Sequence, residues 1–215
     1  MTRDPDDQPA LRLDFRDPVL PPALSWFCEP PRWEVDAEKG RLVLATAAGT
    51  DFWQRTHYGF EVDNGHALML NVPSNVDFTL ATRVHLHALH QYDQAGLMIR
   101  VSSQDWLKTS IEYEPEGTAS RLGAVVTQRG FSDWSTQDVP HDQRSLSLRI
   151  SVKAHDCMVE ASTDEGFHWS QIRLARLNAM ADGPTIQCGL YACSPKDAGF
   201  VAEFEFLEYR PAAGR

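Results

Sequence analysis

The chain has 215 residues, of which 42% are hydrophobic and 23% are charged, and its formal net charge is −10 at pH 7. This composition is typical of a folded domain and too apolar for a disordered chain, and the length suits one all-β domain. The acidic balance argues against a nucleic-acid partner and an anionic membrane surface, because no surplus of lysine and arginine is available to bind phosphates.

Short strands dominate the sequence after an acidic, proline-containing N-terminal tail, which we place at residues 1–19. The clearest strand is S-L-S-L-R-I-S-V-K at residues 145–153, where apolar and polar side chains alternate as they do in a half-buried strand. The expected strands are residues 76–87, 95–101, 107–113, 122–127, 145–153, 186–192 and 201–209. The nearest approach to a helical pattern is weak and lies at residues 171–181. So many short strands predict a sandwich of two antiparallel sheets over residues 20–210.

Two turn motifs stand out between the strands. Asp63-Asn64-Gly65 favours a hairpin, because Asn and Gly both tolerate positive φ. Residues 162–169 match the Asp-box pattern S-x-D-x-G-x-x-W, in which the Asp accepts backbone N–H groups, the Gly takes a strained position and the Trp packs beneath. A single copy indicates a structural turn without chemistry.

The sequence contains no recognisable address or anchor. The N-terminus lacks the basic start and apolar run of a signal peptide, and no window approaches the roughly 18 apolar residues of a membrane span. We therefore expect a cytoplasmic protein. Its four cysteines have no CxxC spacing and are expected to be free thiols in that compartment.

Aromatic residues recur beside polar ones in the middle of the chain. Sugars present apolar C–H faces edged by hydroxyls, so a saccharide site needs aromatic platforms flanked by carboxylate, amide and amine groups. The alternative is that the tryptophans fill the core of the sandwich. The aromatic set is Trp53, Tyr58, Tyr92, Trp106, Tyr113 and Trp134.

Three carboxylates follow one another at alternate positions, at Glu112, Glu114 and Glu116. On one strand face they would have the spacing of about 7 Å per two residues that two-carboxylate glycosidases exploit. Pro115 and Gly117 indicate instead that the strand ends near Glu114 and that the run is exposed. Exposure argues against catalysis, because a general acid needs burial to raise its pKa.

His85 and His87 share one strand face, a geometry compatible with zinc. No third ligand is evident, so we expect histidines on a solvent face or in a groove and no metal site. Motifs for acyl transfer or nucleotide binding are lacking as well, and no cofactor is expected.

The segment TDFWQRTHYGF at residues 50–60, followed by DNGH at residues 63–66, resembles the opening signature of the DUF1349 family, also described as homologues of "regulation of enolase protein 1". The resemblance extends over roughly residues 20–209. Its further segments are residues 92–100, 106–109, 111–113, 125–127, 132–135 and 192–195. The resemblance implies an all-β, concanavalin A-like jelly-roll sandwich of the lectin and glucanase superfamily, with one sheet forming a concave groove. It implies no particular activity.

We predict that this concave face binds a carbohydrate or another polar small molecule, without catalysis. The expected aromatic platforms are Trp53, Trp106 and Trp134. The expected hydrogen-bonding residues are His57, Tyr92, Asp93, Gln94, Lys108 and Glu112.

Two alternatives stay open at this point. One is a saccharide hydrolase or lyase that uses Glu112 with Asp93 or Asp133, which requires opposed carboxylates about 5–10 Å apart. The other is a protein-interaction module that regulates a metabolic enzyme, with a protein partner or a second copy of the chain. Such a module would have an exposed apolar patch on the order of several hundred Å².

Overall fold

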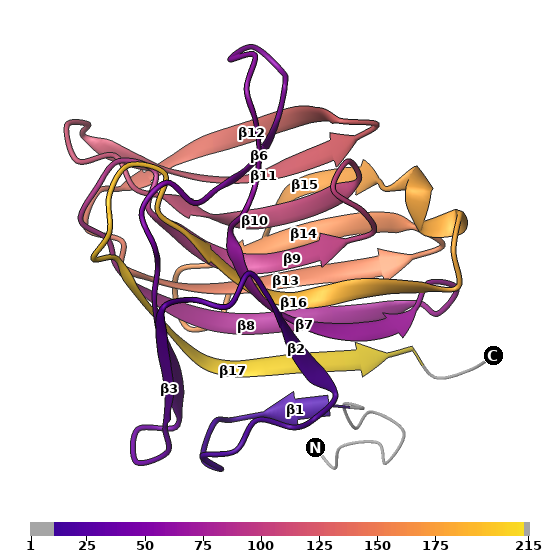
Figure 1. The fold of residues 1–215 in the computed structure, drawn as a ribbon, viewed down its shortest axis with the longest axis horizontal. Coiled ribbons are helices and arrows are strands. Elements are labelled where there is room, and N and C mark those ends of the chain that lie inside the picture. Colours follow the sequence, from indigo (N-terminus) through magenta and orange to yellow (C-terminus); the bar gives the residue numbers. More distant parts are fainter. Residues whose placement is uncertain (1–10, 213–215) are drawn as a thin grey trace.

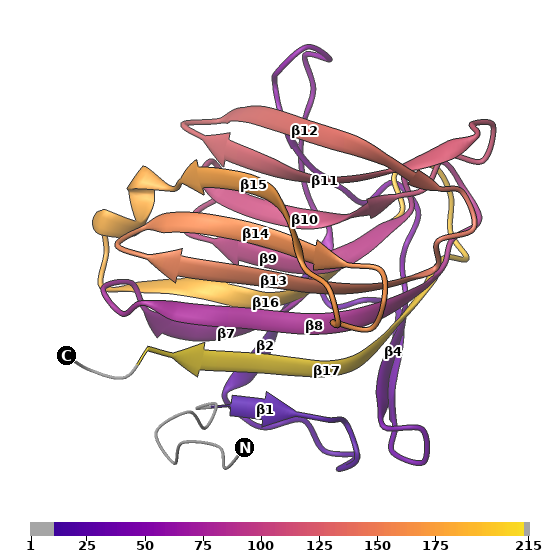
Figure 2. The same cartoon turned by 180° about the vertical axis from the view of Figure 1, so that it is seen from behind.

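The computed structural model describes residues 11–212, which form two large antiparallel sheets and a separate pair of short strands (Figure 1). The eight-stranded sheet has the order β15-β14-β13-β8-β17-β4-β3, and β1 pairs with β17 beside this path. Its strands are β1 (Leu11–Leu13), β3 (Arg32–Asp36), β4 (Arg41–Ala45), β8 (Phe78–His87), β13 (Ser145–Lys153), β14 (Asp156–Ser162), β15 (Ser170–Arg176) and β17 (Val201–Pro211). Figure 2 shows this sheet from its outer side.

The seven-stranded sheet has the order β12-β11-β10-β9-β16-β7-β2. Its strands are β2 (Leu24–Phe27), β7 (His66–Pro73), β9 (Gln94–Arg100), β10 (Trp106–Glu112), β11 (Ala119–Gln128), β12 (Phe131–Pro140) and β16 (Thr185–Cys193). Consecutive strands lie in different large sheets at β1/β2, β2/β3, β7/β8, β8/β9, β12/β13, β15/β16 and β16/β17, as in a jelly roll. The expected all-β sandwich of two antiparallel sheets is confirmed.

The main core lies between the two large sheets and is built by alternate side chains of their strands. In β13, Leu146, Leu148, Ile150 and Val152 are buried while polar residues occupy the positions between them, as predicted. In β10 all seven residues are buried, so both faces of this strand are covered. Leu107 and Ile111 face the main core, whereas Trp106 belongs to a second apolar cluster on the other face.

The second cluster exists because residues 46–65, here called the cover segment, fold over the outer face of the seven-stranded sheet. The cover segment contains β5 (Phe52–Gln54) and β6 (Glu61–Asp63), which pair only with each other in the described chain. The Phe52 ring meets Trp106 and Tyr191 edge-on, with ring centroids 6.0 and 6.2 Å away. A Cβ atom at Gly65 would lie 2.3 Å from that ring, so glycine is needed there for the Phe52 ring to fit.

Residues 171–181, where the helical pattern is weak, hold β15 and then only a short 3-10 helix (Asn178–Ala181), in agreement with the lack of a convincing helix in the sequence. The hairpin expected at Asn64-Gly65 is wrong. The Asn64-Gly65 pair does not close a hairpin, since β6 pairs with β5 while β7 pairs with β2 and β16. Both of its backbone N–H groups donate to the Asp51 carbonyl instead. The pair therefore joins the cover segment to the sheet.

The Asp-box turn between β14 and β15 has the predicted construction. Asp164 accepts hydrogen bonds from the Ser162 hydroxyl and from the backbone N–H of His168, at 2.7 and 2.9 Å. Gly166 has a φ of 91°, and a Cβ atom there would touch Trp169. These contacts account for the motif as a turn.

Part of the expected N-terminal tail belongs to the sandwich. Residues 1–10 of the expected tail lie outside the described residues, whereas Leu11–Leu13 form β1 and Phe15 is buried in the core. The sandwich thus takes in residues that we expected in the tail. All four cysteines are free thiols. Within residues 11–212, no helix is long and apolar enough to cross a membrane.

Candidate functional site

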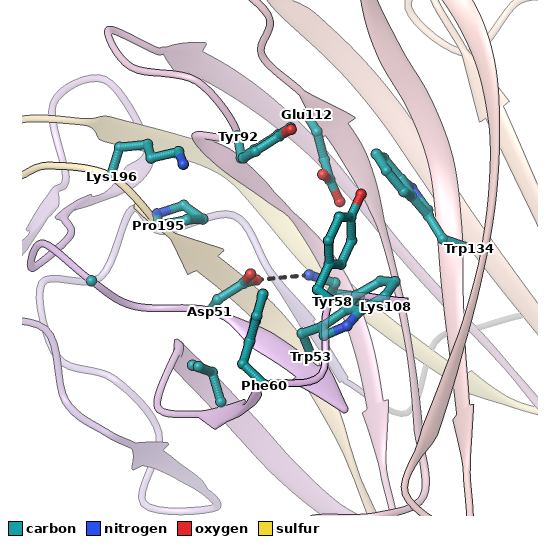
Figure 3. A pocket seen from close by; sticks show the side chains of 12 residues that line it. Asp51, Trp53, Tyr58, Phe60, Tyr92, Lys108, Glu112, Trp134, Pro195 and Lys196 are labelled. Carbon is teal, nitrogen blue, oxygen red and sulfur yellow. Dashed lines mark hydrogen bonds and ion pairs between the residues drawn. The ribbon is translucent and has the colours of Figure 1, made fainter. Parts of the chain in front are cut away.

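A cavity of about 380 Å³ lies between the cover segment and the seven-stranded sheet (Figure 3). The cover segment supplies half of its lining, and the rest comes from β10, β12 and the chain just before β9 and just after β16. The lining residues are Gly49, Asp51, Trp53, Tyr58, Phe60, Val62, Tyr92, Lys108, Glu112, Trp134, Pro195 and Lys196. It is the candidate ligand site.

A buried ion pair forms one part of the cavity. The Lys108 ammonium lies 3.1 Å from Asp51 Oδ1 and donates to Gln94 Oε1 at 2.8 Å. Asp51 Oδ1 also accepts the backbone N–H of Phe52 at 2.7 Å, which fixes the carboxylate. Burial by itself would lower the pKa of Lys108, but the charges of Asp51 and Glu112 outweigh it and hold this pKa above its usual value. Lys108 therefore stays protonated inside the protein.

Glu112 is buried at the end of β10, with 8% of the residue exposed, and its carboxyl has no hydrogen-bond partner within residues 11–212. Burial raises its pKa to about 7, against the opposing effect of Lys108. The expectation that this run is exposed is wrong for Glu112, although β10 does end there. Of the other two glutamates of the run, Glu114 is half-buried and Glu116 is exposed. The cavity thus holds a carboxyl that can donate or accept a proton near neutral pH.

Aromatic rings form the walls. Trp53 lies at the centre, with ring centroids 5.4 Å from Tyr58 and 6.5 Å from Trp134, and its indole N–H donates to the Thr56 carbonyl. Tyr58 in turn stacks on Phe60 at 5.9 Å. Tyr58 and Phe60 lie in the connection between β5 and β6, whereas Trp53 lies in β5 and Trp134 in β12.

The cover segment is anchored to the sheet on both sides of that turn. The Arg100 guanidinium makes two hydrogen bonds to the Asp63 carboxylate, at 2.7 and 2.8 Å, and so ties the end of β6 to β9. The backbone N–H of Gln54 donates to the Ser132 hydroxyl at 2.9 Å, which ties β5 to β12. A bidentate arginine–carboxylate pair fixes orientation as well as distance. The aromatic walls are therefore held rigidly over the sheet.

Of the nine residues predicted to bind a ligand, the structure brings five together around the cavity. They are Trp53, Tyr92, Lys108, Glu112 and Trp134. Gln94 lies beneath them, bonded to Lys108. His57 lines a shallower hollow next to the cavity, which shares Trp53, Tyr58 and Trp134 with it.

Asp93 and Trp106 are fully buried and do not line the cavity. The Asp93 carboxylate accepts hydrogen bonds from the backbone N–H groups of Leu89 and His90 and from the Ser194 hydroxyl, at 2.9, 2.8 and 2.6 Å. Trp106 packs in the second cluster beside Phe52. Their surroundings are those of structural residues.

Asp133, the other expected partner of Glu112, lies outside the cavity and pairs with Arg173 at 2.9 Å. The carboxylate that does share the cavity with Glu112 is Asp51, which the predicted binding set lacks. The predicted set also lacks Tyr58, Phe60 and Lys196, which line the cavity. Asp51, Tyr58 and Phe60 lie in the motif at residues 50–60, but no local pattern in that motif indicates that it folds back over a sheet.

His85 and His87 lie on the outer face of the eight-stranded sheet, away from the cavity. His85 Nε2 is 2.6 Å from Glu205, and His87 Nε2 is 3.1 Å from Glu203, so each imidazole has a carboxylate partner. No group of three or more His, Cys, Asp or Glu residues in the described part of the chain is placed to hold a metal ion.

Comparisons of sequence relate the chain to one family and to one yeast protein. The family described as "Protein of unknown function (DUF1349)" matches residues 26–212. "Regulation of enolase protein 1" of Saccharomyces cerevisiae is 36% identical over 183 residues, which cover 84% of this chain and 85% of that protein.

Two solved structures extend the comparison. A functionally unknown protein from Saccharomyces cerevisiae has a TM-score of 0.79 at 32% identity, with 89% of this chain and 98% of that chain covered. The Bacteroides ovatus protein "Xyloglucan PUL GH43B" has a TM-score of 0.73 at 17% identity, and the match covers 95% of this chain and 39% of that chain.

Proposed function

This chain belongs to the DUF1349 family, and we propose that it binds a saccharide or a similar polyhydroxylated small molecule in the cavity beneath the cover segment. The observation that carries the proposal is the mixture of groups in one space: aromatic rings on the walls, with the Lys108 ammonium and the Glu112 carboxyl between them (Figure 3). Rings suit the apolar faces of a sugar, and the two polar groups suit its hydroxyls.

The size of the cavity sets the size of the ligand. Binding sites for small molecules occupy about 300–1,000 Å³, and a cavity of about 380 Å³ is near the lower end of that range. We therefore expect one or two sugar units rather than a long polymer chain. The name of the Bacteroides ovatus protein includes xyloglucan, which accords with a saccharide ligand, although that likeness concerns the fold alone.

We propose binding without turnover. A glycosidase needs a second carboxyl group that is free to act as nucleophile or base. The second carboxylate in this cavity, Asp51, is engaged through the same oxygen by Lys108 and by the backbone N–H of Phe52. This engagement favours a fixed binding group over a reacting one.

The test is a calorimetric titration of a panel of mono- and disaccharides, at concentrations of about 10 mM that detect millimolar Kd values. Trp134→Ala and Tyr58→Ala remove wall rings and should weaken binding about tenfold, given about 1.4 kcal/mol for a lost stacking contact. Trp33→Ala is the matched control, because Trp33 lies in β3 of the other sheet. Equal affinities in all three variants would contradict the proposal.

A further inference from the structure

Glu112 is the one acidic group in the cavity whose carboxyl is left without a hydrogen bond by residues 11–212. Lys108 does not fill that role, since its ammonium donates to Asp51 and Gln94 and makes no hydrogen bond to Glu112. A buried polar group without a partner is costly, so such groups in native structures usually meet a ligand, an ion or water. The carboxyl belongs to the lining of the cavity and is available to a ligand there.

Most of the other charges around Glu112 are paired. Asp51 and Lys108 neutralise each other. Arg121, directly opposite Glu112 on β11, pairs with Asp138. Glu114 accepts a hydrogen bond from the neutral amide of Gln91, and its negative charge contributes to the raised pKa of Glu112.

Lys196 adds an uncompensated positive charge at the rim. Its ammonium lies 5.6 Å from the centroid of the Tyr92 ring and has no carboxylate partner in the described chain. Figure 3 shows this side chain extending towards Tyr92 on the side of the cavity where Glu112 also lies. The rim of the cavity thus offers an unpaired ammonium group to a ligand.

We propose that the cavity selects a saccharide that carries one anionic group, with that group held between the Lys196 ammonium and the protonated carboxyl of Glu112. This inference rests on the proposed function and names the class of saccharide. An anion in this position supplies the hydrogen-bond acceptor that a protonated Glu112 needs and the counter-charge that Lys196 lacks. A carboxylate and a phosphate group would both meet these requirements.

The proposal predicts how the affinity for an anion depends on pH and whether binding takes up or releases protons. Burial raises the pKa of Glu112 to about 7, so about half of the sites are protonated at neutral pH. An anion that binds the protonated form draws protons onto the protein, and its affinity should fall about tenfold between pH 6 and pH 8 as the competent fraction falls. A neutral sugar that donates its hydroxyls to ionised Glu112 would have the opposite effect and release protons.

The experiment is a titration of the full chain with glucuronate, glucose 6-phosphate, glucose and the neutral amide glucuronamide. Each is measured at pH 6, 7 and 8 and in two buffers of different ionisation enthalpy. We expect one of the two anionic sugars to bind at least tenfold more tightly than the neutral ones, with about half a proton taken up at pH 7. The two anionic probes distinguish a carboxylate from a phosphate.

Variants assign the effect to residues. Glu112→Gln keeps a neutral donor and should bind the anion with an affinity that no longer depends on pH. Lys196→Gln should weaken binding of the anion about fivefold to tenfold, and Lys153→Gln, which removes an exposed lysine of the other sheet, serves as its control. Tighter binding of neutral sugars, or release of protons, would overturn this inference and leave the proposed function standing. If no saccharide of the wider panel binds, both fail.

Discussion

The unpartnered carboxyl of Glu112 should make the stability of the protein depend on pH in a predictable direction. In the folded chain its pKa is about 7, against an ordinary value of 4.5. The folded state therefore holds a proton that the unfolded state has lost between these two values, and stability must fall as the pH rises through this range. A difference of 2.5 pKa units corresponds to a penalty of about 3 kcal/mol, which is complete above pH 7.

Glu112→Gln removes the titrating group while keeping its shape. We expect the free energy of unfolding of the variant, relative to the original chain, to become more favourable by about 3 kcal/mol between pH 4 and pH 8, with most of the change between pH 4.5 and 7. The measurement is denaturant unfolding at each pH, followed by tryptophan fluorescence.

A matched control removes the general effect of charge. Glu34→Gln also takes one negative charge from a chain of net charge −10, but Glu34 is exposed on the other sheet. The Glu112→Gln curve is therefore compared with that of Glu34→Gln. If the two curves run parallel across the whole pH range, Glu112 does not carry a raised pKa and the reasoning is refuted.

Two further substitutions test structural roles. Asp93→Ala should destabilise the fold by about 2–4 kcal/mol, because it leaves the buried Ser194 hydroxyl and two backbone N–H groups without their acceptor. Saccharide affinity, measured by calorimetry on the folded variant, should stay unchanged. A selective loss of affinity would show that Asp93 belongs to the binding site. Phe52→Ala should cost about 3–5 kcal/mol in denaturant unfolding, because the ring is fully buried in the second cluster. A cost below about 1 kcal/mol would show that the cover segment packs only loosely on the sheet.

Local patterns predict the central strands well and the edges poorly. The alternation in residues 145–153 predicts both ends of β13 correctly, because one face of that strand is buried and the other is more open. The sequence of β15 gives no such pattern, because the strand lies at the edge of its sheet and leaves Leu174 mostly exposed. An irregularity in its pairing, next to Glu160, further disturbs the register.

The binding residues that could be predicted from the sequence are those whose placement is a local property of one strand. Lys108 and Glu112 could be found from sequence because they share one face of a strand, which is a local property. Asp51 and Lys196 could not, since only the long-range folding of the cover segment and the turn after β16 brings them to that face. The burial of Glu112 has the same origin. Pro115 indicates where the strand ends, but it does not indicate that the cover segment lies over that end.

The cover segment connects β4 to β7, and its two strands form no ladder with either large sheet in the described chain. It supplies half of the lining of the cavity, whereas the ladders of the jelly roll are formed by strands outside it. The rings that it contributes to the cavity walls can therefore change while those ladders keep their pairing. Exchange of residues 46–65 between relatives that share this fold is thus a route by which one β-sandwich can acquire different small-molecule preferences, both in evolution and by engineering.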